Sequence, residues 1–493
     1  MSDPISPSLV DTLARTQVFC AARGVEAFLV GGLLRDQWLG RPFAYLNADF
    51  AVARGAIALC RELADALPGA FVPLDDEAGS ARVVVEAGGA RVELDISDFR
   101  GKTLEEDLRR RDFTVNAMAM PLAEWLRHPQ DPAPVVDPLN GADALRQRRL
   151  IACFPGTFAD DPVRILRGFR FASQLGFTLD PELPELMRPS VPALVRVSGE
   201  RIRDELFAIL ETDRAHAAVQ ALNGLGVLDV LWPELVAGRG MDQGPFHHLD
   251  VLSHQIETVL QADRFLAEFA EFSEPFRAPL AGYCAQQLVE RRSRKSLIKL
   301  SGLLHDIGKP ERRTIEPDGE IWFLGHDETG AQMVVPMLER LRLSNREAEM
   351  VRLMVRHHLR PGFLSREPQL TRRAVYRFYK DLGDHGPACA LTWWADRMAT
   401  RGSKSRLDQI DQQRAFVEEL LGAYFFKAAE VVRPPRLVDG RRLMEAFGLP
   451  SGPLIGELLA AIEEAQAEGR VRTAEEALAV AKELLDARGV SPA

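Results

Sequence analysis

The chain has 493 residues, of which 46% are hydrophobic and 27% are charged. That composition is typical of a globular protein, and the length leaves room for three or four domains with cores of their own. The net charge of −10 argues against nucleic-acid binding through overall charge, so an RNA partner would require local basic surface.

The cysteines and the hydropathy pattern indicate the cellular compartment in which the protein is expected. Five cysteines are scattered without C-x-x-C spacing, which indicates a reducing environment rather than a disulfide framework. The first twenty residues lack a basic segment followed by an apolar core, and no window approaches an uncharged membrane-spanning length. We therefore expect a cytoplasmic location and no membrane partner.

Residues 1–22 are predicted to form a helix, and residues 26–125 alternate strand and helix patterns. An apolar run stops at Gly31 and Gly32, after which Arg35 and Asp36 open an amphipathic segment. Glycines after a strand let the backbone approach a phosphate, and the start of a following helix attracts negative charge. The motif alone is weak, because most Gly-Gly turns are only turns.

Polar side chains with metal-ligand chemistry follow on two strand-like runs. Asn47 and Asp49 are two residues apart, so a strand points both to one face, where they could hold one metal ion. Residues 91–100 alternate polar and apolar side chains and place Asp95 on an expected adjacent strand.

Residues 107–120 add guanidinium groups. Arg110 and Arg111 are suited to grip triphosphate oxygens, and Asn116 to bond a ribose or a base edge. For the arginines alone, an exposed basic helix start is the favoured alternative. Carboxylates that converge on a metal beside phosphate-binding arginines are typical of phosphoryl or nucleotidyl transfer.

A Pro-rich stretch, residues 128–138, is expected to close this first part, and residues 140–235 are expected to be helical. Basic runs at 109–111, 146–149, 164–170 and 291–295 are candidate RNA-binding surface. For the last run, a solvated loop is equally favoured.

Seven of the ten histidines fall between residues 247 and 358. The adjacent pair His305 and Asp306 ends an apolar helix-like run, and a late aspartate, Asp396, follows the histidines. A single buried histidine would be explained by packing. This larger set suits a transition-metal or Mg²⁺ site with open positions for water.

Six motifs stand in the order found in class II tRNA nucleotidyltransferases, the CCA-adding enzymes and their bacterial poly(A) polymerase relatives. They are VGGLLRD, the (Asn/Asp)-x-Asp strand, RRDFTVNAMA, DPLNGADAL, FADDPVRILRGFRFASQLGF and VSGERIRDEL. The chain resembles this family over residues 26–235. The resemblance implies an α+β fold, in which an α/β nucleotidyltransferase head precedes an all-helical neck and body.

The resemblance also implies site residues. Asp49, Asp95 and Asn47 match the catalytic positions, with Mg²⁺ at Asp49 and Asp95. The positions that match nucleotide-binding motifs are Gly31, Gly32, Arg35, Asp36, Arg110, Arg111, Asp112, Asn116, Asp161, Arg164, Arg167 and Arg170. Of these, Asp161 and Arg164 would present a protein template to the Watson–Crick edge of the incoming base. A helical motif that would brace the template helix is matched by Glu200, Arg201 and Glu205.

The chain departs from the family at one metal ligand. Where the family has D-x-D, this chain has Asn47-Ala48-Asp49, and an amide oxygen brings no negative charge to Mg²⁺. The linker from Gly40 to Asn47 is about two residues longer than expected, and Asp160 stands where the family usually has Glu. A second hypothesis is therefore a degenerate head that only binds RNA, attached to a working hydrolase.

The later histidine-rich region resembles an HD-domain metal-dependent phosphohydrolase. The positions that match its H…HD…D pattern are His254, His305, Asp306 and Asp396. The resemblance further implies His326 and His357 as ligands of a second metal, and Lys309 as a candidate phosphate ligand. The expected metal is a divalent transition ion or Mg²⁺.

These patterns predict four domains: a head over residues 1–138, a helical neck and body over 139–238, a helical HD domain over 239–428 and a helical tail over 429–493. The predicted function is addition of CMP and AMP from CTP and ATP to tRNA 3′ ends, by a monomer or homodimer. A specialised A-adding or CC-adding enzyme, and a tRNA-binding protein with neither activity, are the remaining alternatives.

Overall fold

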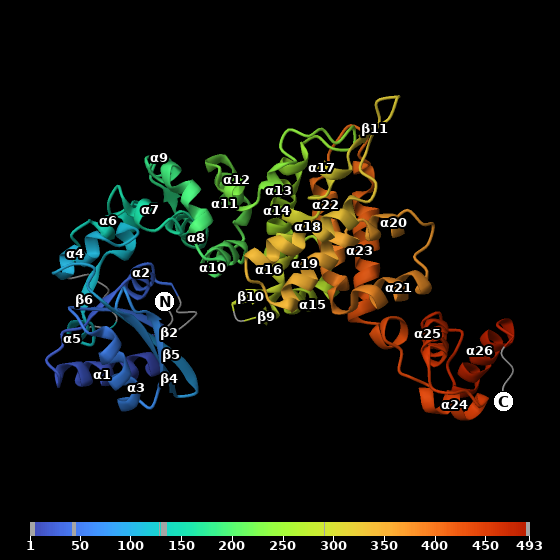
Figure 1. The fold of residues 1–493 in the computed structure, drawn as a ribbon, viewed down its shortest axis with the longest axis horizontal. Helices are drawn as coiled ribbons and strands as arrows, with labels where there is room; N and C mark the ends of the chain where they lie inside the picture. The colour runs from blue at the N-terminus through green and yellow to red at the C-terminus, as the bar shows by residue number, and fades with distance from the viewer. Residues whose placement is uncertain (1–4, 42–45, 128, 130–135, 290, 490–493) are drawn as a thin grey trace. The chain divides into compact units, whose positions relative to one another are not determined.

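The computed structural model describes residues 5–41, 46–127, 129, 136–289 and 291–489 (Figure 1). The chain divides into two compact units. The first consists of Met1–Val197 and Leu225–Val227, and the second of Ser198–Gly224 and Leu228–Ala493. The expected extension before Asn47 and most of the Pro-rich stretch lie outside the described residues.

A six-stranded sheet of order β3-β4-β5-β2-β1-β6 is the centre of the first unit. The central pair β2 and β5 is parallel, and the other neighbouring pairs are antiparallel. The strands are β1 (Phe28–Val30), β2 (Leu46–Val52), β3 (Ala70–Asp75), β4 (Ser80–Ala87), β5 (Ala90–Asp98) and β6 (Ala119–Pro121).

The two faces of this sheet have different roles. Helices α1 (Pro7–Ala21) and α3 (Ala56–Ala66) contribute to the apolar core that covers one face. Along β2, Ala48 and Phe50 belong to that core, so alternation along the strand turns Asn47 and Asp49 to the opposite face. The polar side chains of β2 therefore lie on the face of the sheet opposite the apolar core.

Short helices and two small strands complete the part of the first unit that the structure describes. They are α2 (Gly32–Trp38), α4 (Leu104–Arg109), η1 (Thr114–Asn116), α5 (Leu122–Trp125), α6 (Gly141–Gln147), β7 (Arg149–Leu150), α7 (Thr157–Asp160), α8 (Arg164–Leu175), β8 (Thr178–Leu179), α9 (Leu183–Met187) and η2 (Arg188–Arg196).

From residue 199 onward the chain is almost entirely helical (Figure 1). The longer helices are α10 (Gly199–Leu210), α11 (Ala215–Leu225), α14 (Val251–Glu268), α15 (Glu274–Ala285), α16 (Arg294–Leu304), α18 (His326–Arg340), α19 (Asn345–His357), α21 (Arg372–Leu382), α22 (Gly386–Ala399) and α23 (Ile410–Phe425). The short elements are α12 (Val227–Leu231), α13 (Pro233–Val236), α17 (Lys309–Arg312), α20 (Arg360–Leu364), η3 (Gly383–His385), η4 (Leu407–Gln409), η5 (Ala428–Val432), and the strands β9 (Gln287–Val289), β10 (Arg292–Ser293), β11 (Thr314–Ile315) and β12 (Ile321–Trp322).

Helix α16 lies at the centre of the second unit. It packs against α14, α19 and α22, and nearly all of its residues are buried, as expected for a helix covered on all sides. Its buried Lys299 is neutralised by Asp263, with Nζ and Oδ1 2.7 Å apart. The end of α16 therefore offers a rigid position for the His305-Asp306 pair.

The last helices, α24 (Gly440–Phe447), α25 (Pro453–Ala467) and α26 (Ala474–Ala487), form an apolar cluster of their own. Arg373 and Arg377 of α21 both donate to Glu464 of α25, at 2.6 and 2.8 Å. The structure confirms the predicted fold class, a mixed α/β head followed by helical parts. No helix among the described residues is long and apolar enough to cross a membrane. The boundaries of the four predicted domains stay predictions.

Candidate functional site

The first candidate site lies on the polar face of the sheet. Asp49 and Asp95 are directly opposite each other in the parallel β2–β5 pair, which confirms the expected adjacent strand. Burial and the nearby carboxylate of Asp95 raise the pKa of Asp49, and Arg111 and Arg167 act in the opposite direction. The carboxylate of Asp95 disfavours the charged form of Asp49, and a cation bound beside them would offset that effect.

The Gly-Gly turn holds Asp49 in position. The backbone N–H of Gly32 donates to the Asp49 carboxylate. Gly31 has a φ of +73°, and a Cβ there would lie 3.0 Å from Oδ2 of Asp49. Glycine is therefore required at position 31 both for its backbone conformation and for the close approach of the carboxylate.

Arg82 is a site residue that the sequence did not reveal. It is opposite Asp95 in the β4–β5 pair and binds it with two parallel hydrogen bonds, Nε to Oδ1 at 2.7 Å and Nη2 to Oδ2 at 2.8 Å. Its Nη1 is 2.8 Å from Oε2 of Glu93, which is opposite Asn47 in the β2–β5 pair. Only the cross-strand register brings these residues together, so spacing along the chain gives no signal for them.

Asn116 and Asp112 form a buried network with the first motif. Arg35 binds Asp36 through Nε and Nη2, both at 2.9 Å, and donates from Nη1 to Oδ1 of Asn116 at 2.8 Å. Asn116 in turn donates to Asp112 at 3.2 Å. Both ends of the Asn116 amide are thus engaged within the protein, where the sequence suggested a contact with ribose or base.

Helix α8 joins this network through Arg167. Burial raises the pKa of Asp112, but Arg167 and the backbone N–H of Phe113 outweigh it and hold the pKa well below its usual range. The guanidinium groups of Arg35, Arg167 and Arg170 all lie within 5.2 Å of the centre of the Phe171 ring. These cation–π contacts place three positive charges around the middle of α8.

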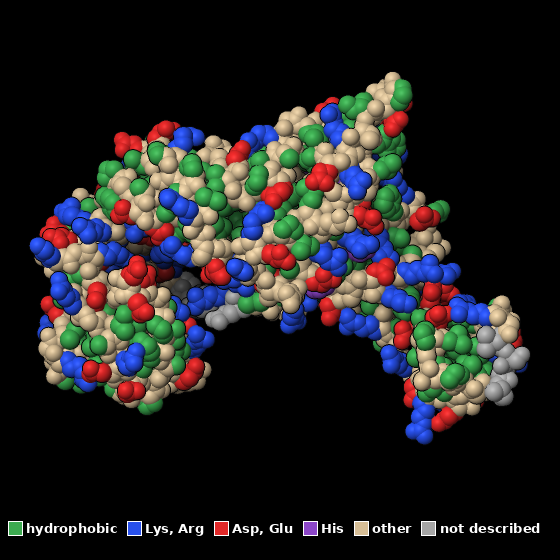
Figure 2. All heavy atoms as spheres, viewed as in Figure 1, with side chains coloured by type: hydrophobic (Ala, Val, Ile, Leu, Met, Phe, Trp, Pro, Cys, Tyr) green, Lys and Arg blue, Asp and Glu red, His purple; other side chains and the backbone are tan. Residues whose placement is uncertain are grey.

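The remaining predicted residues of the first unit lie around the start of α8 and the end of α4. Arg164 opens α8 and donates to the Thr157 hydroxyl at 2.8 Å, while Asp161 ends α7 just before it. Arg110 is exposed at the end of α4, and Arg111 donates to Asp107 at 2.9 Å. Figure 2 shows Lys and Arg side chains gathered over α4 and α6.

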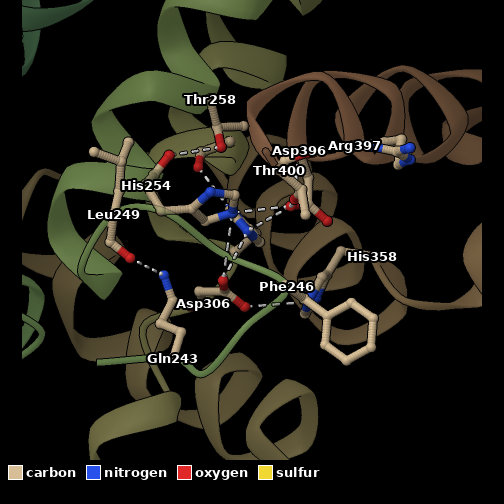
Figure 3. Close-up of polar contacts among 12 residues, drawn as sticks. Gln243, Phe246, Leu249, His254, Thr258, Asp306, His358, Asp396, Arg397 and Thr400 are labelled. Carbon is tan, nitrogen blue, oxygen red and sulfur yellow. Dashed lines mark hydrogen bonds and ion pairs between the residues drawn. The ribbon is translucent and has the colours of Figure 1, made fainter. Parts of the chain in front are cut away.

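The second candidate site is a buried cluster of imidazoles and carboxylates in the second unit. Figure 3 shows His254 of α14, Asp306 after α16, His358 after α19 and Asp396 of α22 pointing toward one another. His254 Nε2 is 2.9 Å from Asp396 Oδ1, and His305 Nε2 is 3.1 Å from Asp306 Oδ2. Two overlapping groups, His254 with His305 and Asp396, and His305 with Asp306 and His358, have ligand atoms within 4.8 Å of one another.

Backbone carbonyls orient three of these imidazoles. The Nδ1 atoms of His305, His326 and His358 lie 2.7–2.8 Å from the carbonyl oxygens of Gly302, Phe323 and Val355. An Nδ1–H that donates to a carbonyl leaves Nε2 as a lone pair, the arrangement typical of metal-bound histidine. These lone pairs face Asp306 at 3.1–3.5 Å, which is repulsive unless a cation or a proton lies between.

The charges in the cluster are mutually dependent. Burial alone would lower the pKa of His305, but the carboxylates of Asp306 and Asp396 raise it. Burial likewise opposes the charged form of Asp306, yet His305 and Lys309 hold its pKa well below the usual range. Lys309 donates to Asp306 Oδ2 at 2.6 Å and to Gln243 at 2.7 Å, so the predicted phosphate ligand is bonded inside the cluster.

The structure corrects one predicted ligand position. His358, not His357, enters the cluster, with its Nε2 3.2 Å from that of His326 and 3.5 Å from Asp306 Oδ1. His357 is the last residue of α19 and is only half-buried. The adjacent histidines 357 and 358 indicate in the sequence that one of them is a ligand. Successive residues of a helix point about 100° apart, so only the packing decides which one faces inward.

Three family descriptions match the chain in order: "Poly A polymerase head domain" over residues 27–151, "Probable RNA and SrmB- binding site of polymerase A" over 176–238 and "HD domain" over 251–381. The A-adding tRNA nucleotidyltransferase of Deinococcus radiodurans is 36% identical over 461 residues, covering 92% of this chain and 94% of that protein. The chain belongs to the tRNA nucleotidyltransferase family. This is a family of enzymes.

Further relatives differ in how much of the chain they match. The CC-adding tRNA nucleotidyltransferase of Thermus thermophilus is 34% identical and covers 92% of each chain. The multifunctional CCA protein of Pseudomonas fluorescens is 30% identical over 68% of this chain and 75% of its own length. Among solved structures, the Thermotoga maritima CCA-adding enzyme complexed with tRNA has a TM-score of 0.62 at 21% identity over 98% of this chain and 96% of that one, a likeness of fold.

Both sites have donor sets that fit the divalent metals typical of such domains. In the head, the Oδ1 atom of Asn47 is buried and accepts no hydrogen bond from the described residues, so it remains available to a cation beside Asp49 and Asp95. Oxygen donors of this kind suit Mg²⁺. The imidazole and carboxylate donors of the second site suit a transition metal or Mg²⁺.

Proposed function

We propose that this chain transfers nucleotides to the 3′ end of tRNA, adding CMP and AMP from CTP and ATP. The observation that carries the proposal is the polar face of the sheet, where Asp49 and Asp95 stand opposite each other under the influence of Arg111 and Arg167. A carboxylate pair beside guanidinium groups is what a nucleotide triphosphate with its metal requires.

The residues divide the work as follows. Asp49 and Asp95, together with the amide oxygen of Asn47, would hold Mg²⁺, which supplies positive charge for the attacking and leaving oxygens. Arg110 and Arg111 bind triphosphate oxygens. Asp161 and Arg164, at the start of α8, read the Watson–Crick edge of the incoming base. The Arg35–Asn116–Asp112–Arg167 network fixes α8 relative to the Gly-Gly turn.

A specialised enzyme is the second candidate, and the comparisons favour it. The relatives that match more than nine-tenths of this chain at 34–36% identity are an A-adding and a CC-adding enzyme. The multifunctional CCA protein matches only 68% of the chain. A chain of this kind would add only A or only CC.

The test is incubation with Mg²⁺, labelled CTP or ATP, and tRNAs that end at the discriminator base, at C and at CC. Addition of C, C and A supports the CCA-adding function. Addition of A to the CC-ending tRNA alone, or of two C residues alone, supports the specialised enzyme. Absence of any incorporation overturns both.

Asn47, in place of a metal-binding aspartate, is the basis of a third hypothesis. In it, the head only binds RNA and the second unit is the enzyme. The expected reaction there is metal-dependent hydrolysis of phosphoesters such as 2′,3′-cyclic phosphates. Asn47→Asp adds a full negative charge beside Asp49 and Asp95, so it should raise incorporation at limiting Mg²⁺ by about tenfold or more. If the unsubstituted chain incorporates nucleotides and the substitution changes nothing, the amide oxygen already suffices and the hypothesis of a degenerate head is wrong.

A further inference from the structure

A cavity of about 500 Å³ lies in the second unit, and none of its lining residues belongs to the buried cluster of imidazoles and carboxylates. Its lining comes from four places in the fold. They are Leu288 of β9; Arg294, the first residue of α16; Asn345, Arg346 and Glu349 at the start of α19; and Asp384 and His385 at the end of η3. Ligand pockets for nucleotide-sized molecules have volumes in this range.

Arg294 is the unusual member of this lining. It is only 5% exposed, its Cζ lies 4.2 Å from the centre of the Tyr283 ring, and its Nε donates to none of the residues that the structure describes. Among the described residues it forms no ion pair. A buried guanidinium without a carboxylate is costly, because its desolvation is not offset by an opposite charge.

Its neighbours in the sequence show that this is not a general feature of the basic run 291–295. Arg292 is paired with Glu347, Ser293 donates to Glu211, and Lys295 is paired with Asp213. The run is therefore neither a solvated loop nor an open basic patch. Within this run, Arg294 lines the cavity and has no direct ion pair in the described part of the chain.

Neither of the two carboxylates that line the cavity forms a direct ion pair with Arg294, although the charge of Arg294 helps to lower the pKa of Asp384. Glu349 is held by Arg352 through two hydrogen bonds of 2.8 Å, and Asp384 is held by Arg433 and by the Tyr424 hydroxyl. Arg346 is exposed and, within the described ranges, has no ion pair either. The cavity thus carries two guanidinium groups that form no direct ion pair among the described residues.

The surrounding backbone adds to this positive charge. Both α16 and α19 begin at the cavity, and the positive ends of two helix dipoles favour an anion there. The Nδ1 atom of His385 is buried beside them without a hydrogen-bond partner from the described residues. At 1.5 Å per residue, the eleven residues of α16 separate Arg294 from His305 by roughly 16 Å, so the cavity is distinct from the cluster of imidazoles and carboxylates.

We infer that this cavity binds a phosphate group through the guanidinium groups of Arg294 and Arg346 and the imidazole of His385. Planar guanidinium forks match phosphate oxygens, and a phosphate would give Arg294 the direct ion pair that it lacks among the described residues. The phosphate belongs either to an RNA backbone or to a free nucleotide. This inference is independent of the proposed function, because the cavity holds no metal ligand and no residue of the head.

The first experiment measures binding of inorganic phosphate to the full chain by calorimetry, in EDTA so that metal-bound phosphate does not contribute. Arg294→Met and Arg346→Gln should each weaken one binding event by about tenfold or more. Arg356→Gln removes an exposed arginine from the same helix outside the cavity and should leave that event unchanged. Crystals soaked in tungstate should show anomalous density against Arg294, Arg346 and His385.

Measurements of tRNA binding distinguish an RNA phosphate from the phosphate of a free nucleotide. If RNA is the ligand, Arg346→Gln weakens tRNA binding and lowers the salt dependence by about one phosphate contact. If a nucleotide is the ligand, tRNA binding is unchanged and ATP competes with inorganic phosphate for the event lost in the variants. Equal phosphate binding by the unsubstituted chain and both variants, or tungstate density elsewhere but not in the cavity, would overturn the inference.

Discussion

At the scale of single residues, the buried cluster of the second unit depends on which nitrogen of each imidazole faces inward. Three backbone carbonyls at 2.7–2.8 Å fix the Nδ1 side of His305, His326 and His358. The orienting groups are therefore main-chain atoms, one of which, the Val355 carbonyl, lies in the last turn of α19. A side chain can be removed from this arrangement without disturbing how the others are oriented.

This arrangement gives a prediction that separates His358 from its neighbour. His358→Ala should abolish tight metal binding in the second unit, because it removes an Nε2 that faces Asp306. His357→Ala should retain it, since that side chain is half-buried outside the cluster. Metal content after dialysis and metal-dependent phosphoester hydrolysis measure the difference. Equal losses in the two variants would show that the doublet shares the ligand role.

The residues that could be predicted from the sequence are those whose chemistry is local. Gly31, Asp49 and the His305-Asp306 pair stand in motifs that carry their own spacing, and the structure brings Asp49 and Asp95 together as expected. Arg82 and the inward choice of His358 could not be predicted. Both depend on tertiary packing, the first on strand register and the second on the rotation of α19.

At the scale of elements, contacts at the start of α19 stabilise the helix whose other end carries His358. Ser344 and Glu347 form a capping box at its start, and Glu347 also binds Arg292 through Nε at 2.6 Å and Nη2 at 3.2 Å. The S-x-x-E spacing can be read from the sequence. The bond to β10, 55 residues earlier, cannot, because nothing in the chain between them specifies it.

Glu347→Gln should destabilise α19 by about 2–3 kcal/mol at pH 7, since it breaks a largely buried charged pair. Burial raises the pKa of Glu347, but Arg292 and Ser344 outweigh it, so the folded pKa lies below the ordinary value. The carboxylate's contribution is then complete above about pH 4.3, the unfolded pKa, and is lost as the pH falls through the folded pKa. The variant should approach the unsubstituted chain only in that acidic window.

Hydrogen exchange of the α19 amides at pH 7, 5 and 3.5 measures this local stability without assuming that the whole chain unfolds in one step. Glu349→Gln is the matched control, because Glu349 lies on the same helix in an exposed pair with Arg352 and should change stability by less than about 1 kcal/mol. A penalty for Glu347→Gln that persists unchanged at pH 3.5 would mean that shape rather than charge holds the start of the helix.

At the scale of the whole molecule, the two candidate sites belong to separate compact units with separate packing. Asp49 and Asp95 stand on a sheet whose other face is covered by α1 and α3, whereas the imidazole cluster is held by α14, α16, α19 and α22. No metal ligand proposed for one site comes from the other unit. Loss of a ligand in one unit therefore leaves the packing that supports the other site intact.

The last prediction is that the two activities can be removed one at a time. Asp49→Ala should abolish nucleotide incorporation and leave metal-dependent hydrolysis within about twofold, because substitutions without shared partners act independently. His305→Ala should do the reverse, since it removes an imidazole between Asp306 and Asp396. Incorporation into tRNA and hydrolysis of a cyclic phosphate are measured on the same preparations, with thermal melting to confirm folding. If His305→Ala also stops incorporation while the chain stays folded, the cluster of imidazoles and carboxylates takes part in the transferase reaction. The prediction that the two units act independently would then be wrong.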